Sequence, residues 1–175
     1  MIKIEFEGEV YYFNKGKLYD DSYFEVPQSI SKKVATHYYN NLNYNEFDEE
    51  KFLEYLKNLK ASELYSKCIS AVEYAFKKFN NSEEMCRIIL PIATSCYRLL
   101  GEPKKAIAFW EERKTTFYSC VSSALFTSLA AAYCDMEDYD KAKKNADRAC
   151  ALSGGPYKMA QELIGVYSRI KAETK

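Results

Sequence analysis

The sequence predicts a mainly α-helical protein of antiparallel helix–turn–helix pairs, about seven to eight helices in all, after a small N-terminal antiparallel β meander. Apolar residues recur at helical spacing from about residue 28 onward. At the N-terminus, apolar and charged residues alternate instead, which is typical of a half-buried strand. A helix pair with the same pattern of large and small residues also recurs along the chain, and this indicates repeats.

The pattern is clearest in residues 123–155, which predict two helices folded back on each other. The first helix carries large apolar residues along one face: Phe126, Leu129, Ala130 and Tyr133. The second carries alanines at the same spacing: Ala142, Ala146 and Ala149. Asp138 is placed to cap the second helix, and Glu137 lies near the positive end of its dipole. A large-residue helix beside a small-residue helix predicts a close antiparallel contact.

These residues resemble the tetratricopeptide repeat, a helix–turn–helix unit of about 34 residues. The positions that fall on the offsets of that motif are Leu129, Tyr133, Tyr139, Ala142, Ala146 and Ala149. Three positions depart from it, with Phe126 in place of Trp, Ala130 in place of Gly and Gly154 in place of Pro. The resemblance implies a TPR-like α-solenoid.

The same spacing of motif residues recurs before and after this helix pair. Ala106 follows Tyr97 by nine residues, as Ala142 follows Tyr133, and Ala142 comes 36 residues after Ala106. Trp110 takes the position of Ala146. Further on, Leu163 and Tyr167 repeat the first helix 34 residues later. We therefore expect repeats at 82–122 and 123–156 and a capping helix at 157–175, so the resemblance covers about 82–175.

Residues 1–27 predict a separate β appendage. Strands are expected at 2–6, 10–13, 18–19 and 23–26, with a turn at 14–17. A sheet of so few strands is rarely stable alone. We therefore expect it to pack on the helices or to pair with another sheet.

Residues 28–81 predict helices without a clean repeat motif, either a degenerate repeat or an N-terminal cap of the helical domain 28–175. Ser29 or Ser31 is expected to cap a helix that bears Ile30, Val34 and Tyr38, and a loop is expected at 40–45. A second helix should start at Asp48 and a third at Ser62. Their expected apolar residues are Phe52, Tyr55, Leu56 and Leu59 in one, and Tyr65, Cys68, Val72, Phe76 and Phe79 in the other.

After a break at 80–82, Ser82 is expected to cap the next helix. Pro91 implies either a kink in that helix or a regular part that begins near Leu90. Pro103 suits the first turn of the helix after it. A last helix is expected to run through Ala160, Leu163, Ile164, Tyr167 and Ile170.

Twenty-five acidic and twenty-five basic residues leave the chain neutral, which argues against binding to nucleic acid or to an anionic membrane. The sequence has no apolar run of spanning length and no signal-peptide layout, so we expect a soluble cytoplasmic protein. The six cysteines are spread singly and predict small buried hydrophobes rather than disulfides or metal ligands. We expect no cofactor and no metal.

Catalysis by a Ser–His–Asp or Cys–His arrangement would have to use His37, the single histidine. A packed or surface histidine is the alternative that we favour. The acidic clusters at 48–50 and 135–140 occur where helices start, and capping explains them better than general acid catalysis or calcium binding. The sequence therefore predicts a protein that is not an enzyme.

In tetratricopeptide proteins, the first helices of successive repeats line a concave groove that binds extended peptides. The resemblance places these residues in the groove: Ile88, Pro91, Ser95, Arg98, Leu99, Ala124, Thr127, Ala131, Cys134, Asp135, Lys158, Gln161, Gly165, Ser168 and Arg169. Ser95, Ala131 and Gly165 occupy positions where the carboxylate-clamp subtype has Asn, so recognition of chaperone C-terminal tails is not expected. The groove would accept an apolar or acidic peptide, or the chain's own N-terminal segment.

The sequence thus favours a non-catalytic adaptor or scaffold that binds a protein or peptide. The alternative is a homo-oligomer, such as a homodimer, assembled through the N-terminal strands and exposed aromatic residues. A small enzyme using His37 or a cysteine is the third hypothesis.

Overall fold

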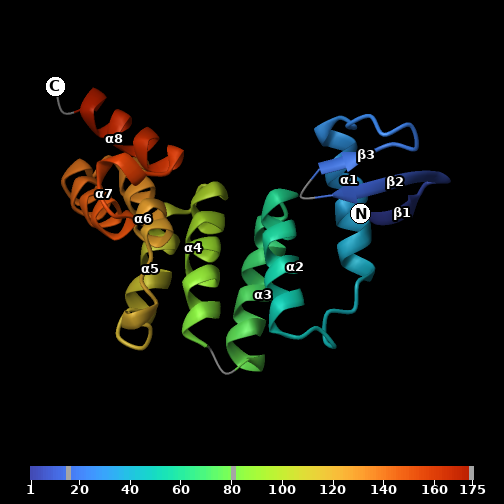
Figure 1. Cartoon of the computed structure of the whole chain (residues 1–175), viewed down its shortest axis with the longest axis horizontal. Coiled ribbons are helices and arrows are strands. Elements are labelled where there is room, and N and C mark those ends of the chain that lie inside the picture. The colour runs from blue at the N-terminus through green and yellow to red at the C-terminus, as the bar shows by residue number, and fades with distance from the viewer. Residues whose placement is uncertain (15–16, 80–81, 174–175) are drawn as a thin grey trace. The chain divides into compact units, whose positions relative to one another are not determined.

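The computed structural model describes residues 1–14, 17–79 and 82–173. Within these ranges the protein is mainly helical, with eight α-helices that follow a three-stranded antiparallel sheet (Figure 1). The chain forms two compact units, Met1–Ala75 and Phe76–Lys175. The predicted turn at 14–17 and the predicted break at 80–82 lie partly outside the described residues.

The sheet consists of β1 (Ile2–Phe6), β2 (Glu9–Asn14) and β3 (Lys17–Tyr19) in the order β1-β2-β3. Ile4 pairs with Tyr11, and Tyr12 pairs with Tyr19. The hairpin between β1 and β2 turns through Glu7 and Gly8, both with positive φ, which suits the right-handed twist of the strands. The first three predicted strands are confirmed.

The predicted strand at 23–26 is wrong. It contributes one isolated bridge, between Tyr19 and Glu25. The Asp20 side chain accepts hydrogen bonds from the backbone N–H groups of Ser22 and Phe24, and Tyr23 has a φ of 63°. This local side-chain turn takes the backbone out of the extended region.

One face of the sheet packs on α1 (Gln28–Asn41). The buried sheet residues are Ile4, Phe13 and Leu18, and the buried residues of α1 are Val34, Ala35 and Tyr39. The prediction for α1 is wrong in two respects. Pro27 is the N-cap residue, so Ser29 and Ser31 lie inside the helix. The helix also continues through Asn41, where a loop was expected.

The next two helices are α2 (Glu49–Ala61) and α3 (Tyr65–Lys78). The Asp48 cap of α2 is confirmed, since its side chain accepts from the backbone N–H of Lys51, and the four predicted apolar residues are buried. Ser62 does not open α3. Its backbone N–H bonds to the carbonyl of Asn58 and closes α2, and α3 begins three residues later. Of the five residues predicted to be buried here, Cys68 and Val72 are buried, whereas Tyr65, Phe76 and Phe79 are half-buried.

Aromatic rings fill the core of the first unit around Tyr39 and Tyr55. Tyr39 lies edge-on to Phe13 at 6.1 Å and to Tyr55 at 5.6 Å, and Tyr55 also contacts Phe52 and Tyr44. Within the described residues, the hydroxyl groups of Tyr39 and Tyr55 are buried without a hydrogen-bond partner. Burial raises the pKa of both hydroxyl groups. This core therefore depends on ring packing more than on polar pairing.

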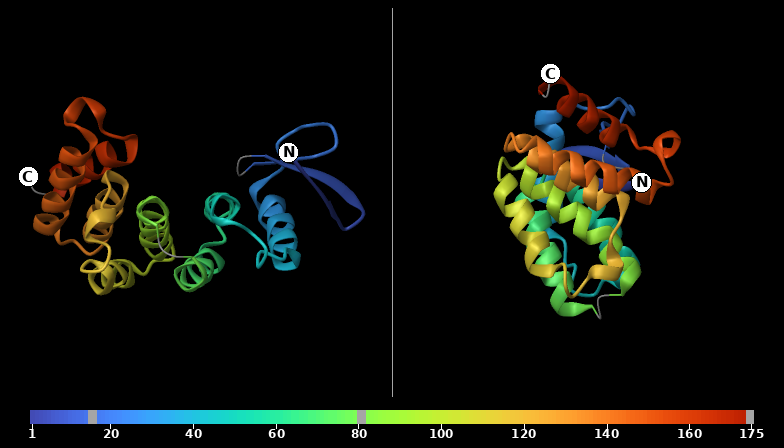
Figure 2. Two further views of the ribbon diagram at one scale, coloured as in Figure 1. Left: turned by 60° about the horizontal axis from the view of Figure 1, so that its bottom comes forward. Right: turned by 90° about the vertical axis from the view of Figure 1, so that its left-hand side faces the viewer.

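The second unit contains α4 (Glu83–Leu99), α5 (Pro103–Arg113), α6 (Ser123–Asp135), α7 (Tyr139–Ser153) and α8 (Gln161–Glu173). Short 3₁₀ helices occur at Tyr118–Cys120 and Pro156–Lys158. α4 packs on α5 and α6, and α6 also packs on α5, α7 and α8 (Figures 1 and 2). α6 is thus the central helix of this unit.

The local signals predicted most of these helix ends. Ser82 accepts from the backbone N–H of Met85, and Asp138 accepts from that of Lys141. Pro103 is in the first turn of α5, and Gly154, with a φ of 90°, closes α7. α4 begins at Glu83 and continues through Pro91, so the alternative in which its regular part begins near Leu90 is wrong.

The contact between α6 and α7 has the predicted composition. Phe126, Leu129 and Ala130 are buried on α6, and the three alanines of α7 have no exposed surface: Ala142, Ala146 and Ala149. In α8 the buried residues are Leu163, Val166 and Ile170. Ile164 on the same helix is 41% exposed, and Tyr167 is half-buried.

The partnerless hydroxyl of Tyr39 leads to a prediction. Replacing Tyr39 with Phe should leave the free energy of unfolding unchanged or raise it, because an unpaired buried hydroxyl costs about 1–3 kcal/mol. Tyr39→Ala should lower the free energy of unfolding by about 3–5 kcal/mol because it removes the ring. Urea denaturation followed by circular dichroism measures both. A loss of more than about 1 kcal/mol in the Phe variant would show that the hydroxyl has a stabilising partner.

Candidate functional site

Three of the residues predicted for the groove meet in the structure. Asp135, at the end of α6, accepts from Arg98 of α4 and from Arg169 of α8. The Oδ2 atom of Asp135 lies 3.3 Å from Nη1 of Arg98, and its Oδ1 atom lies 2.8 Å from Nη2 of Arg169. We call these three residues the arginine–aspartate cluster. It joins the three helices that the resemblance assigns to the groove.

The arginine–aspartate cluster has one more positive than negative charge. The side chains of Arg98 and Asp135 are each 26% exposed, and that of Arg169 is 45% exposed. Burial lowers the pKa of Arg169, but the hydrogen bond and charge of Asp135 outweigh it and raise the pKa overall. Nε of Arg98 is buried without a hydrogen-bond partner among the described residues. A guanidinium has five N–H donors, so both arginines keep donor capacity beyond Asp135.

The other predicted groove residues differ in exposure. On α4, Ile88 is half-buried and Leu99 is 42% exposed. On α6, Thr127 and Ala131 are each 8% exposed, and the Thr127 hydroxyl donates to the carbonyl of Ser123. Gln161 begins α8. The placement of Lys158 on the last helix is wrong, because Lys158 ends the preceding 3₁₀ helix (Pro156–Lys158) and is exposed.

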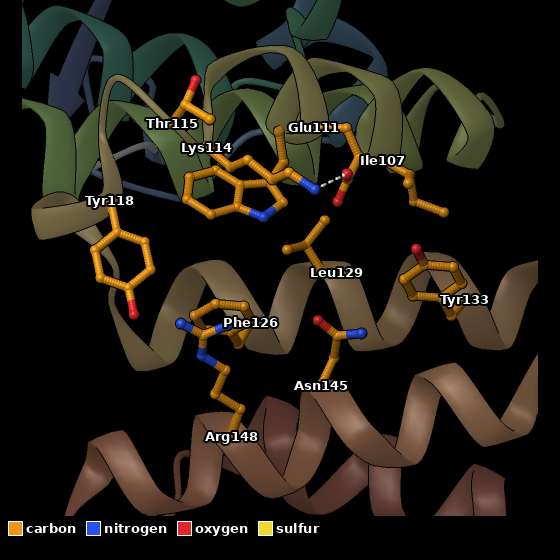
Figure 3. Close-up of a pocket in the computed structure, with 11 residues that line it drawn as sticks. Ile107, Glu111, Lys114, Thr115, Tyr118, Phe126, Leu129, Tyr133, Asn145 and Arg148 are labelled. Carbon is orange, nitrogen blue, oxygen red and sulfur yellow. Dashed lines mark hydrogen bonds and ion pairs between the residues drawn. The ribbon is translucent and has the colours of Figure 1, made fainter.

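A second site, which the sequence did not predict, is a pocket of about 480 Å³ between α5, α6 and α7 (Figure 3). We call it the α5–α7 pocket. Its floor is formed by Phe126, Leu129 and Tyr133 of α6. α5 and the segment after it contribute Ile107, Trp110, Glu111, Lys114, Thr115 and Tyr118, and α7 contributes Asn145 and Arg148. An apolar interior with a few polar groups at its edges is typical of ligand-binding pockets, and its volume is in their usual range.

The charged residues of the α5–α7 pocket include one ion pair and one arginine outside it. Glu111 and Lys114 form an ion pair across one turn of α5. Arg148 has no carboxylate partner among the described residues, and its guanidinium carbon lies 4.1 Å from the ring centroid of Phe126. The close-up shows Arg148 beside Phe126, with Asn145 on the same helix (Figure 3). A guanidinium stacked on a ring keeps its N–H edge free for an anion.

Two features of the sequence explain why this pocket forms. Trp110 occupies on α5 the position that Ala146 occupies on α7, and its ring packs edge-on against Phe126 at 6.2 Å. The connection from α5 to α6 is also long enough to contain a 3₁₀ helix. The bulky residue and the 36-residue spacing were visible in the sequence. Nothing local in the sequence showed that Arg148 would reach the same space.

His37 lies on α1, where its ring is 5.2 Å from that of Phe6. The hollow beside it is lined by Lys3, Ile4, Glu5, His37, Tyr38, Asn41 and Leu42, which include no cysteine or serine among the described residues. Five of the six cysteines are buried as predicted, and Cys150 is half-buried; none of the six forms a disulfide. Burial raises the pKa of the Cys134 thiol.

In the ranges 1–14, 17–79 and 82–173, no three His, Cys, Asp or Glu side chains gather as a metal site would require. Across the same described residues, no helix combines the length and the apolar character needed to cross a membrane.

Comparisons of the chain with protein-family models, with curated proteins and with solved structures found no match.

The arginine–aspartate cluster leads to a stability prediction. Asp135→Asn should lower the free energy of unfolding by about 1 kcal/mol, because it removes the charge that holds two partly exposed arginines. The same substitution in an Arg169→Gln background should cost less, since one of the two pairs is already absent. Urea denaturation of the four proteins measures this coupling. Asp140→Asn, at an exposed position of α7, is the matched control. Equal costs of Asp135→Asn in the two backgrounds would contradict the pairing.

Proposed function

We propose that residues 82–173 form a TPR-like helical-repeat module that binds an extended segment of a partner protein, without catalysis, as an adaptor or scaffold. The motif positions of the sequence and the packing of α6 on the alanine face of α7 both support this class of protein. Repeat modules of stacked helices use extended surfaces to bind their partners.

The arginine–aspartate cluster is the observation that carries the proposal. It brings together side chains from α4, α6 and α8, whose surfaces would line the groove of such a module. Thr127 and Ala131 lie on α6 at helical spacing from Asp135, and each is only 8% exposed. The accessible part of this surface is therefore formed mainly by Arg98, Asp135 and Arg169.

The excess positive charge of this surface indicates the chemistry of the partner. Two arginines share one carboxylate, and Arg169 is 45% exposed. Arginine binds carboxylates through paired N–H donors, so an acidic residue of the partner can join the cluster. The proposed partner is therefore an extended acidic segment with apolar residues, held along α4, α6 and α8.

The turn that follows β3 supports a second candidate function. Phe24 is 72% exposed and Tyr23 is 62% exposed, and both lie in the turn that follows β3. Adjacent exposed aromatic residues are enriched at protein interfaces. This turn therefore favours association with a second copy of the chain.

Gly165 allows a direct test of the groove. It is exposed one turn before Arg169 on α8, and a side chain at this position would meet no neighbouring atom within 4 Å. Gly165→Trp should block the surface and reduce binding to an array of acidic, apolar-containing peptides by at least about tenfold. Gly165→Ala is the matched control and should bind as the wild type does. Equal binding by all three proteins would rule out this surface as the site.

Self-association is tested by light scattering over a range of concentrations. If the turn after β3 forms an interface, the wild type should show a dimer that weakens on dilution, and Phe24→Ser should be monomeric. Ser22→Ala, in the same exposed turn, is the control. A wild type that is monomeric at every concentration would remove this second function.

A further inference from the structure

We propose that the α5–α7 pocket is a second binding site, separate from the groove surface, for a short peptide segment that combines one aromatic side chain with one carboxylate. The floor of the pocket supplies the contacts for the aromatic side chain. Arg148 supplies the contact for the carboxylate.

The walls and floor of the pocket match an aromatic side chain. Phe126 and Leu129 form an apolar floor, and Trp110 packs against Phe126. Aromatic side chains bury a large area and pack well edge-on or offset against other rings. Tyr118 at the rim is 69% exposed, so an incoming ring would also cover this side chain.

The charged residues of the pocket favour a ligand with a single negative charge. The Lys114 ammonium is held by Glu111, so this pair adds no net charge. Arg148 is stacked on Phe126 and, among the described residues, has no carboxylate partner. One unpaired guanidinium complements one carboxylate through two parallel hydrogen bonds, whereas a doubly charged phosphate group usually takes several cations.

The pocket also offers a polar group for the backbone of a peptide. Nδ2 of Asn145 donates to the carbonyl of Lys141, which fixes the orientation of the amide. Its Oδ1 atom accepts no hydrogen bond within the described part of the chain and can accept one from a peptide N–H. Ring, carboxylate and backbone N–H therefore each have a partner in the pocket.

Trp110 makes this site directly measurable, because it is the single tryptophan of the chain and lines the pocket. The probes are capped peptides in which one Phe and one Asp are separated by zero to three serines. We expect at least one of them to change the Trp110 emission saturably at concentrations up to about 1 mM, in the range of weak peptide sites. The matched peptide with Asn in place of Asp should bind at least about tenfold more weakly.

Variants test the role of Arg148. Arg148→Ala should weaken binding of the Asp peptide by about tenfold to hundredfold, and Arg148→Lys should restore it only in part, because lysine lacks the planar pair of donors. Lys143→Ala, which removes a positive charge from α7 outside the pocket, is the control and should bind as the wild type does. Circular dichroism checks that each variant is folded.

The possible outcomes separate this site from the groove surface. Gly165→Trp should leave binding of the Asp peptide unchanged, so either site can fail without the other. The proposal is overturned if no Asp peptide gives a saturable change, if the Asn peptide binds equally well, or if Arg148→Ala and Lys143→Ala behave alike. A further probe has phosphoserine in place of Asp. If it binds more tightly than the Asp peptide, the assignment of a single carboxylate as the ligand of Arg148 is overturned.

Discussion

The close contact between α6 and the alanine face of α7 is the constraint on which the second unit depends. Ala142, Ala146 and Ala149 are fully buried, and their small side chains allow α7 to pack closely on α6. Larger side chains at these positions would force the helices apart, and a packed interior tolerates such changes poorly. Because α6 also packs on α4, α5 and α8, its position sets those of the other helices of the unit.

The same helix positions the residues of both candidate sites. One stripe of α6 carries Thr127, Ala131 and Asp135, and a different stripe carries the pocket floor residues Phe126, Leu129 and Tyr133. α6 thus carries both the carboxylate that pairs with Arg98 and Arg169 and the apolar floor of the α5–α7 pocket, over which Arg148 lies. Sites built on regular elements keep their geometry better than sites on loops.

The first unit follows a different packing rule. Its sheet is small and lies on α1, and its core consists of aromatic rings that contact one another edge-on or stacked. Rings of this size fill the space between a short sheet and helices with few residues. The buried hydroxyls of Tyr39 and Tyr55 are the cost of using tyrosine there, since the rings pack well but their polar atoms find no partner among the described residues.

The sequence by itself determined the features that depend on local spacing. The helix pair 123–155, the caps Asp48, Ser82 and Asp138, and the first three strands follow from periodicity and from side-chain to backbone bonds within a few residues. It also predicted that Arg98, Asp135 and Arg169 would share a surface, but only through the resemblance to a repeat family.

The tertiary structure alone decided the features that depend on contacts distant in sequence. It buried Tyr39 of α1 against Phe13 of the sheet and Tyr55 of α2. It also brought Arg148 over Phe126, from two different helices, to make the α5–α7 pocket. Side-chain spacing fixes which face of a helix is apolar, but the partner of that face is set by packing across the whole unit.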